Sequence, residues 1–161
     1  MLPETQVVGS YVMRVVTIQT YMFKSVGPAA FSNMACQMAP YFSTITPEIS
    51  ELSPGHAVVN VPFRKEITNH LASVHAIALC NAAELAGGMM TDASIPSGAK
   101  WIPKGMTVEY LAKAKSNIRA VADGSGIDWE TGGDKFVPVD IFDEGGVKVF
   151  TAKITMNVKI A

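Results

Sequence analysis

The chain has 161 residues, enough for one domain with a substantial hydrophobic core. Charged residues make up only 17% and apolar residues 48%, which indicates that part of the surface is buried between subunits. A net charge of −1 argues against general nucleic-acid binding, and the start of the chain lacks the basic and apolar segments of a signal peptide.

Residues 25–47 carry no charge, but Pro28, Pro40 and scattered polar residues disqualify them as a membrane span. Cys36 and Cys80 lie in apolar contexts and are interpreted as reduced, buried thiols of a cytoplasmic protein. A disulfide between them is the less favoured alternative. We therefore expect neither a membrane nor a nucleic acid as a partner.

The first part of the chain predicts helices followed by a β-hairpin. Pro28 can open a second helix after the break at Gly27, and Pro40 ends it. Ser53-Pro54-Gly55 is a hairpin signal, and Pro62 indicates an edge strand or a strand end. The elements are expected at Gln6–Lys24, Pro28–Met38, Ile45–Ser50 and His56–Phe63.

The stretch from Val74 to Met90 predicts a helix that is buried on all sides, because apolar residues cover every face of it. Against this background His75, Asn81 and Glu84 stand out, since a buried ionisable group is costly unless something pairs with it. Both ionisable residues also have an ordinary explanation. Glu84 can be a carboxylate satisfied by a local donor, and His75 a simple helix-start histidine.

The strands predicted after this helix complete the fold class. They are expected at Lys104–Lys115, Ile118–Asp123, Phe136–Asp143 and Val147–Ile160, with loops at Ser94–Gly98 and Gly124–Lys135 and a turn at Asp143–Gly146. One long buried helix and an antiparallel meander give an α+β fold, with the sheet wrapped around the helix. We interpret the chain as a single domain, 1–161, with an N-terminal helical segment at 1–40 and a core at 41–161.

The spacing of His75 and Glu84 predicts a site shared between two copies of the chain. Nine residues at about 100° each place the two side chains on opposite faces of a helix, about 13 Å apart along its axis. They therefore cannot serve one site within a single chain. If both are functional, a second copy of the helix runs antiparallel beside the first, and a two-fold axis gives two sites per dimer.

The start of this helix carries further candidate chemistry. Ser73 is the expected N-cap, which places His75 and Ala76 in the first turn, where backbone N–H groups lack intrahelical acceptors. Those donors favour a carbonyl oxygen that gains negative charge, and the small Ala76 lets a ligand approach its own N–H. Asn69, from the preceding loop, can orient a water or hold the substrate. An oxyanion pocket with a carboxylate base suits hydrolysis of an activated acyl group.

The pattern Asn69-x5-His75-x8-Glu84, entering a long buried helix, resembles the hotdog-fold acyl-CoA thioesterases of the phenylacetic-acid-degradation type. The resemblance implies that Asn69 and His75 lie at the helix start and that Ala76 donates its backbone N–H to the thioester carbonyl. It further implies that Glu84 comes from the partner subunit of a homodimer. Two such dimers could associate into a tetramer, but the sequence does not indicate how they would pair. The implied substrate is acyl-CoA or a related acyl thioester. No cofactor is expected, because coenzyme A is part of the substrate.

Two positions depart from the pattern of that family. The usual His-Gly-Gly reads His75-Ala76-Ile77, and the commoner aspartate is Glu84. Ile77 is expected to narrow the mouth of the site, and Glu84 reaches one methylene further than aspartate. Both departures also fit the poorly characterised hotdog relatives.

Further substrate-binding candidates lie outside this pattern. Lys113 and Lys115, near Arg119, can meet the phosphates of coenzyme A, with solvated strand ends as the alternative. Gly87 and Gly88 are costly inside a helix, which a close approach by the partner helix or by substrate would justify; helix termination is the alternative. No metal is expected, because the histidines lack carboxylate or cysteine partners at ligand spacing.

Three functions remain open from the sequence. The first is hydrolysis of an acyl-CoA thioester, with Ala76 as the oxyanion donor and Glu84 as base or nucleophile. The second is dehydration or hydration of an acyl thioester, although the His-Phe-Pro-Gly signature of the dehydratases is absent. The third is a non-catalytic acyl-binding or structural dimer in which Glu84 is merely buried.

Overall fold

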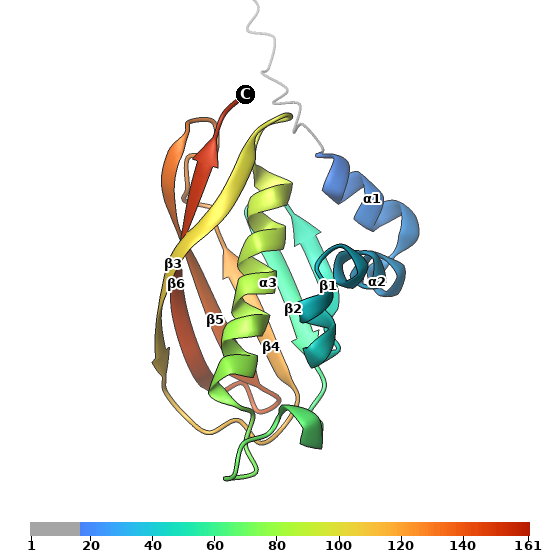
Figure 1. The fold of residues 1–161 in the computed structure, drawn as a ribbon, viewed down its shortest axis with the longest axis vertical. Coiled ribbons are helices and arrows are strands. Elements are labelled where there is room, and N and C mark those ends of the chain that lie inside the picture. Colours follow the sequence, from blue (N-terminus) through green and yellow to red (C-terminus); the bar gives the residue numbers. More distant parts are fainter. Residues whose placement is uncertain (1–16) are drawn as a thin grey trace, which may run out of the picture.

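In the computed structural model, which describes residues 17–161, a six-stranded antiparallel sheet curves around one central helix (Figure 1). The helices are α1 (Ile18–Val26), α2 (Pro28–Met38) and α3 (Ala76–Ser94), with short 3-10 helices η1 (Pro40–Ile45) and η2 (Lys65–Ile67). The strands are β1 (Glu48–Ser53), β2 (His56–Val61), β3 (Lys100–Tyr110), β4 (Ile118–Asp123), β5 (Gly133–Asp143) and β6 (Lys148–Lys159). Within residues 17–161 no helix is both long and apolar enough to cross a membrane.

The two N-terminal helices lie beside β1, outside the curve of the sheet around α3 (Figure 1). Gly27 separates them with a φ of 84°, a conformation that favours glycine, and its N–H closes α1 on the carbonyl of Phe23. Pro28 then opens α2, so the predicted helix at Pro28–Met38 is confirmed. The predicted helix at Gln6–Lys24 begins outside the described residues; its described part ends two residues later than expected, at Val26.

The predicted hairpin forms β1 and β2, joined at Ser53 and His56. β1 begins three residues later than expected, because Ile45 ends η1 and Thr46 adopts a left-handed conformation with a φ of 49°. Pro62 marks the end of β2 rather than an edge, since β2 pairs with both β1 and β4.

The sheet has the order β1-β2-β4-β5-β6-β3, so β1 and β3 are its two edges. β4 lies where the sequence predicts it, and β5 and β6 differ from the expected bounds by at most three residues. β3 is shifted toward the N-terminus, because Trp101 already pairs with Val158 of β6. Beyond Tyr110 the N–H groups of Leu111 and Ala112 both donate to the carbonyl of Val149, and regular pairing ends there.

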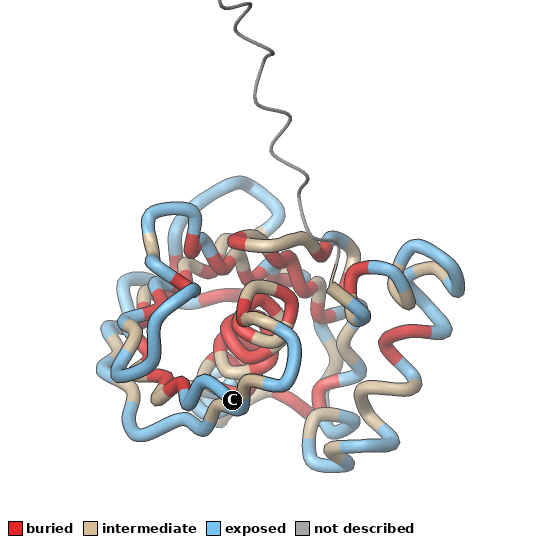
Figure 2. Tube along the Cα trace, turned by 90° about the horizontal axis from the view of Figure 1, so that it is seen from above, coloured by how far each residue is buried: buried red, intermediate tan, exposed pale blue. Residues whose placement is uncertain are grey.

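α3 fills the concave side of the sheet, and its sheet-facing residues are almost fully buried (Figure 2). Ala83 and Ala86 are inaccessible to solvent, as are Val137 and Val139 of β5. Small helical side chains let the strands approach the helix closely, which gives interior-like packing around it. The α+β fold with a sheet wrapped around one helix is therefore confirmed.

Candidate active site

His75, not Ser73, is the N-cap of α3. The His75 backbone is extended, with φ −61° and ψ 139°, and its Nδ1 accepts the N–H of Ile77 at 3.0 Å. Nδ1 therefore carries no proton, and in the neutral ring the proton lies on Nε2. The expected Ser73 cap is wrong because the Ser73 hydroxyl donates to Asn69 Oδ1, at 3.1 Å, within the preceding loop.

Asn69 organises the loop that leads into α3. Its Oδ1 accepts the N–H of Leu71 and the N–H and hydroxyl of Ser73, at 3.0, 3.2 and 3.1 Å respectively. Because a backbone N–H can only donate, the accepting atom must be the amide oxygen, which fixes the orientation of this side chain. Among residues 17–161 its NH₂ group has no acceptor, so Asn69 offers a bound substrate a donor but no acceptor.

Asn69 and Ala76 line the same small cleft, of about 130 Å³, between the loop before α3 and the end of β3. Tyr110 and Lys113 also line it. In the described part of the chain the backbone N–H of Ala76 has no acceptor, as expected for the first residue of a helix. The structure thus brings together the two residues that the sequence predicts to face a substrate carbonyl. After the role that the sequence predicts for it, we call this the oxyanion cleft.

His75 faces a different cleft, of about 190 Å³, on the other side of the helix start. Ile77 and Asn81 line this second cleft with Thr44 of η1. Asn81 is 6% exposed, and its Nδ2 donates to the Thr44 hydroxyl at 3.2 Å. The buried Asn81 Oδ1 has no donor within residues 17–161. His75 therefore shapes the helix start as a cap, and it does not join Asn69 and Ala76 in the oxyanion cleft.

Glu84 lies on the side of α3 that the sheet leaves uncovered. It is half-buried, as is Cys80 one turn before it, and Ile77 two turns before it is 54% exposed. Within residues 17–161 the Glu84 carboxylate makes no ion pair. Eight residues separate Glu84 from Ala76, an axial rise of about 12 Å, so in one chain they cannot both contact a single carbonyl group.

Cys80 and Tyr110 connect this uncovered side of α3 to the oxyanion cleft. The Cys80 Sγ lies 3.4 Å from the Tyr110 hydroxyl. This hydrogen bond raises the pKa of Tyr110 to about 12, and desolvation and the Coulomb interaction with Cys80 act in the same direction. Tyr110 therefore remains a neutral hydroxyl at the rim of the cleft throughout the physiological pH range.

Gly87 and Gly88 are closely packed within their own chain. A Cβ at Gly87 would lie 3.0 Å from the side chain of Ile154, and a Cβ at Gly88 would lie 2.9 Å from the Trp101 ring. Both glycines are buried, and the helix continues past them to Ser94. The close approach that offsets their cost is therefore to the sheet of their own chain.

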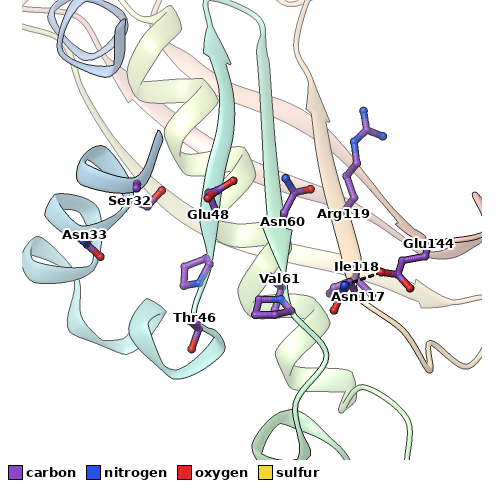
Figure 3. Close-up of a pocket in the computed structure, with 13 residues that line it drawn as sticks. Ser32, Asn33, Thr46, Glu48, Asn60, Val61, Asn117, Ile118, Arg119 and Glu144 are labelled. Carbon is purple, nitrogen blue, oxygen red and sulfur yellow. Dashed lines mark hydrogen bonds between the residues drawn. The ribbon is translucent and has the colours of Figure 1, made fainter. Parts of the chain in front are cut away.

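The three basic candidates do not form one cluster. Lys113 lines the oxyanion cleft, and Lys115 is exposed in the loop that follows it. Arg119 instead lines a polar groove of about 630 Å³ between α2 and the outer face of the sheet (Figure 3). There Glu48, Asn60 and Arg119 form a row across three paired strands. The prediction that Lys113, Lys115 and Arg119 bind the phosphates of coenzyme A together is therefore wrong within one chain. Arg119 projects from the outer face of the sheet, whereas Lys113 lies on the side of α3.

The structure also contains an apolar groove beside α3 that the sequence did not predict. Its volume is about 410 Å³, and its walls come from α1, α2, α3 and β3. Four of its twelve lining residues are methionines, Met22, Met34 and Met89 among them. The content of nine methionines in 161 residues was a signal, but only the fold shows that residues so far apart in sequence share one groove.

Comparison with known proteins places this architecture in a family. A family model described as a domain of unknown function (DUF4442) matches residues 27–158. A structural-genomics protein, described without function or organism, is 58% identical, with a TM-score of 0.81 over 89% of this chain and 97% of its own. A search of curated proteins gave no match.

More distant solved structures share the fold. A thioesterase from Haemophilus influenzae is 17% identical, with a TM-score of 0.71 over 81% of this chain and 89% of its own. A Pseudomonas aeruginosa protein of unknown function, described as a probable thioesterase, is 23% identical, with a TM-score of 0.70 over 79% and 91%. The chain therefore belongs to the family described as a domain of unknown function (DUF4442), and it has the hotdog fold of these thioesterases.

Proposed function

We propose that this protein hydrolyses acyl thioesters such as acyl-CoA to a free acid and a thiol, in sites shared between the two subunits of a homodimer. The observation that carries the proposal is the unpaired backbone N–H of Ala76. Ala76 is the first residue of the long helix α3, and it lines a cleft that Asn69 also lines. A polarised donor at a helix N-terminus stabilises negative charge that develops on a carbonyl oxygen.

The oxyanion cleft offers two donors to a thioester carbonyl. One is the Ala76 N–H, and the other is the NH₂ group of Asn69, whose oxygen is held by the loop. His75 supports this arrangement indirectly, because its ring accepts the next N–H along, that of Ile77, and fixes the first turn. Loss of one such donor typically lowers turnover about 100- to 1000-fold.

The carboxylate needed to complete the site is Glu84 of a second copy. Glu84 lies about 12 Å from Ala76 along α3, on the side that faces away from the sheet. β3 is an edge strand of 11 residues, and such an edge presents unpaired backbone groups that a second copy can pair with. A two-fold axis beside β3 would set the two α3 helices antiparallel and bring each Glu84 toward the other subunit's Ala76.

The chemical step follows from these positions. The Glu84 carboxylate removes a proton from a water molecule while the water oxygen attacks the thioester carbon, and the carbonyl oxygen becomes an anion held by the two donors. The carbon–sulfur bond then breaks, the thiolate takes up a proton, and the free acid leaves. Direct attack by Glu84 on the same carbon, followed by hydrolysis of the anhydride, uses the same residues.

The test of this function is thiol release from acyl-CoA substrates by wild-type protein and by Glu84→Gln. The variant preserves shape but removes the base, and we expect turnover to fall at least about 100-fold. Glu84→Asp is expected to keep partial activity, because it retains a carboxylate. A dimeric Glu84→Gln protein that turns over at the wild-type rate would exclude Glu84 as the base, whereas a wild-type protein that releases no thiol from any acyl-CoA would leave a binding protein.

A mixing experiment tests whether the site is shared. Dimers exchanged between Ala76→Pro and Glu84→Gln subunits contain one intact pair, with Ala76 from one chain and Glu84 from the other. An equal mixture should therefore recover about a quarter of wild-type activity, because half of the dimers are mixed and each has one working site. No recovery, with exchange verified by mass spectrometry, would contradict a site built from Ala76 of one subunit and Glu84 of the other.

A further inference from the structure

A methionine-lined groove runs along α3 on the side of the N-terminal helices. We define the methionine groove by six residues: Met22 of α1, Met34 and Met38 of α2, Leu85 and Met89 of α3, and Trp101 of β3. Its volume, about 410 Å³, falls in the range of small-molecule sites, which is about 300 to 1,000 Å³. Met38 at its rim is 87% exposed, which leaves a large apolar side chain in water.

The groove lies next along α3 from the residue whose carboxylate the proposed hydrolysis requires. Leu85 directly follows Glu84 in α3, and Trp101 packs against Gly88, one turn further along. A side chain at position 88 would push this ring away, since even a Cβ would lie 2.9 Å from it. The glycine therefore sets the position of Trp101 as a wall of the groove. Glu84 itself does not line the groove, since its side chain points about 100° around the helix from that of Leu85, so the acyl chain must pass from the thioester carbon at Glu84 around α3 to enter it.

The far end of the groove is polar. Asp92 lines it there, and its Oδ1 accepts the Trp101 Nε1–H at 3.1 Å. From Leu85 to Asp92 the helix rises about 11 Å. With carbon–carbon bonds of about 1.5 Å, an extended chain advances about 1.3 Å per carbon, so about eight carbons span this length. A longer chain would press against a carboxylate that it cannot hydrogen-bond.

The lining favours an alkyl chain over a ligand with its own polar groups. Of the twelve residues around the groove, only Gln19, Asp92 and Trp101 carry a polar group, and the indole N–H of Trp101 is already bound to Asp92. Methionine side chains are unbranched and flexible, so they adapt to a chain that has many conformations. A polar or charged acyl group would lose its water there without gaining hydrogen bonds.

We infer that the methionine groove binds the acyl chain, and that the substrates are thioesters of straight, saturated acids of about eight carbons. This inference rests on the proposed hydrolysis at Ala76 and Glu84. In the dimer, Ala76 of one subunit binds the thioester carbonyl, and the acyl chain lies in the methionine groove of the subunit that supplies Glu84.

Chain-length kinetics test the inference. With straight-chain acyl-CoA substrates from acetyl to palmitoyl, kcat/KM should rise up to about fourfold per methylene and level off near eight carbons. Ala35 also lines the groove, and Ala35→Phe should lower the ratio of octanoyl to butyryl kcat/KM about tenfold or more. Ala30→Phe, at an exposed position of the same helix, is the matched control and should leave that ratio unchanged. Equal ratios in the two variants would overturn the inference.

A binding measurement separates this inference from the proposed function. The chain has two tryptophans, and neutral 8-bromooctanol seated in the groove should quench Trp101. Quenching should persist in Trp129→Phe, disappear in Trp101→Phe, and require more ligand in Ala35→Phe than in Ala30→Phe. Such quenching without hydrolysis of any acyl-CoA would support the groove and refute the thioesterase. Hydrolysis with no chain-length preference and no quenching of Trp101 would support the thioesterase and refute acyl-chain binding in the groove.

Discussion

The two faces of α3 differ in what they contact, although they belong to one continuous helix. The sheet-facing side consists of small and apolar residues such as Ala83, Ala86 and Gly87, all buried against the strands. The uncovered side carries Ile77, Cys80 and Glu84, which are exposed or half-buried. The first face has its partner within the chain and sets the fold. The sheet meets the second face only at its edge, where Tyr110 of β3 contacts Cys80, and the candidate chemistry lies there.

The largest expected effect is a loss of activity on substitution of Ala76, at the start of α3. Ala76→Pro should lower thiol release about 100- to 1000-fold, because proline removes the N–H that binds the oxyanion. The helix should still form, since proline is favoured at the first helical position and the His75 backbone is already extended. Ala76→Gly, which keeps the N–H, should retain most activity. Normal turnover by a folded Ala76→Pro protein would exclude the oxyanion assignment.

The second prediction tests the sheet-facing side. Gly87→Val places two methyl groups where even a Cβ meets Ile154 at 3.0 Å, and overpacking of this kind should destabilise the protein by about 1–3 kcal/mol. Urea unfolding measures this loss. Glu84→Gln, on the other face, should change the unfolding free energy by no more than about 0.5 kcal/mol. If both variants lost stability equally, the two faces would not have separate roles.

A smaller effect distinguishes a cap from a catalytic base at His75. His75→Ala removes the acceptor for the Ile77 N–H, which should cost about 1 kcal/mol of stability. His75→Asn should recover most of it, because asparagine is a good N-cap. A base would instead contribute about 100-fold or more to turnover. A 100-fold loss of activity in His75→Asn would therefore assign a catalytic role to this histidine.

The smallest effect concerns the titration of Tyr110. Cys80→Ala removes the hydrogen bond that raises the Tyr110 pKa to about 12, so that pKa should fall toward 10. Because the folded-state pKa is raised, the associated stability is complete below pH 10 and is lost as the pH rises toward 12. Phenolate absorbance measures the shift. An unchanged titration in Cys80→Ala would show that the hydrogen bond is not its cause.

Much of the fold follows from local sequence patterns. Alternating apolar and polar residues, prolines and glycines predict β4, α2 and the β1–β2 hairpin. Each of these signals involves only a few neighbouring residues. The bounds of β3 could not be found in this way, because Trp101 belongs to a strand only through its pairing with β6. Similarly, His75 displaces Ser73 as the cap because Asn69 already engages the serine hydroxyl.

Those parts of the candidate site were predictable that depend on the sequence spacing of residues in α3 and in the loop before it. The approach of Asn69 to Ala76 follows from a short loop, and the separation of Glu84 from Ala76 follows from helix geometry. The location of Arg119 on the outer face depends on strand register across β2 and β4, which a single sequence does not reveal. The methionine groove depends on how α1 and α2 pack against α3 and β3, which involves four separate segments.

The two edges of the sheet limit how far copies of this chain can add to one another. At β1, the Ser32 hydroxyl accepts the N–H of Ile49 at 2.8 Å, so α2 occupies hydrogen-bonding capacity that another strand would need. β3 is therefore the edge open to growth. Two copies joined through β3 would form a continuous sheet with an α2-covered strand at either end, which makes such assembly self-limiting and keeps it from propagating as a fibre. Any larger oligomer must then form through side chains on the faces of the molecule.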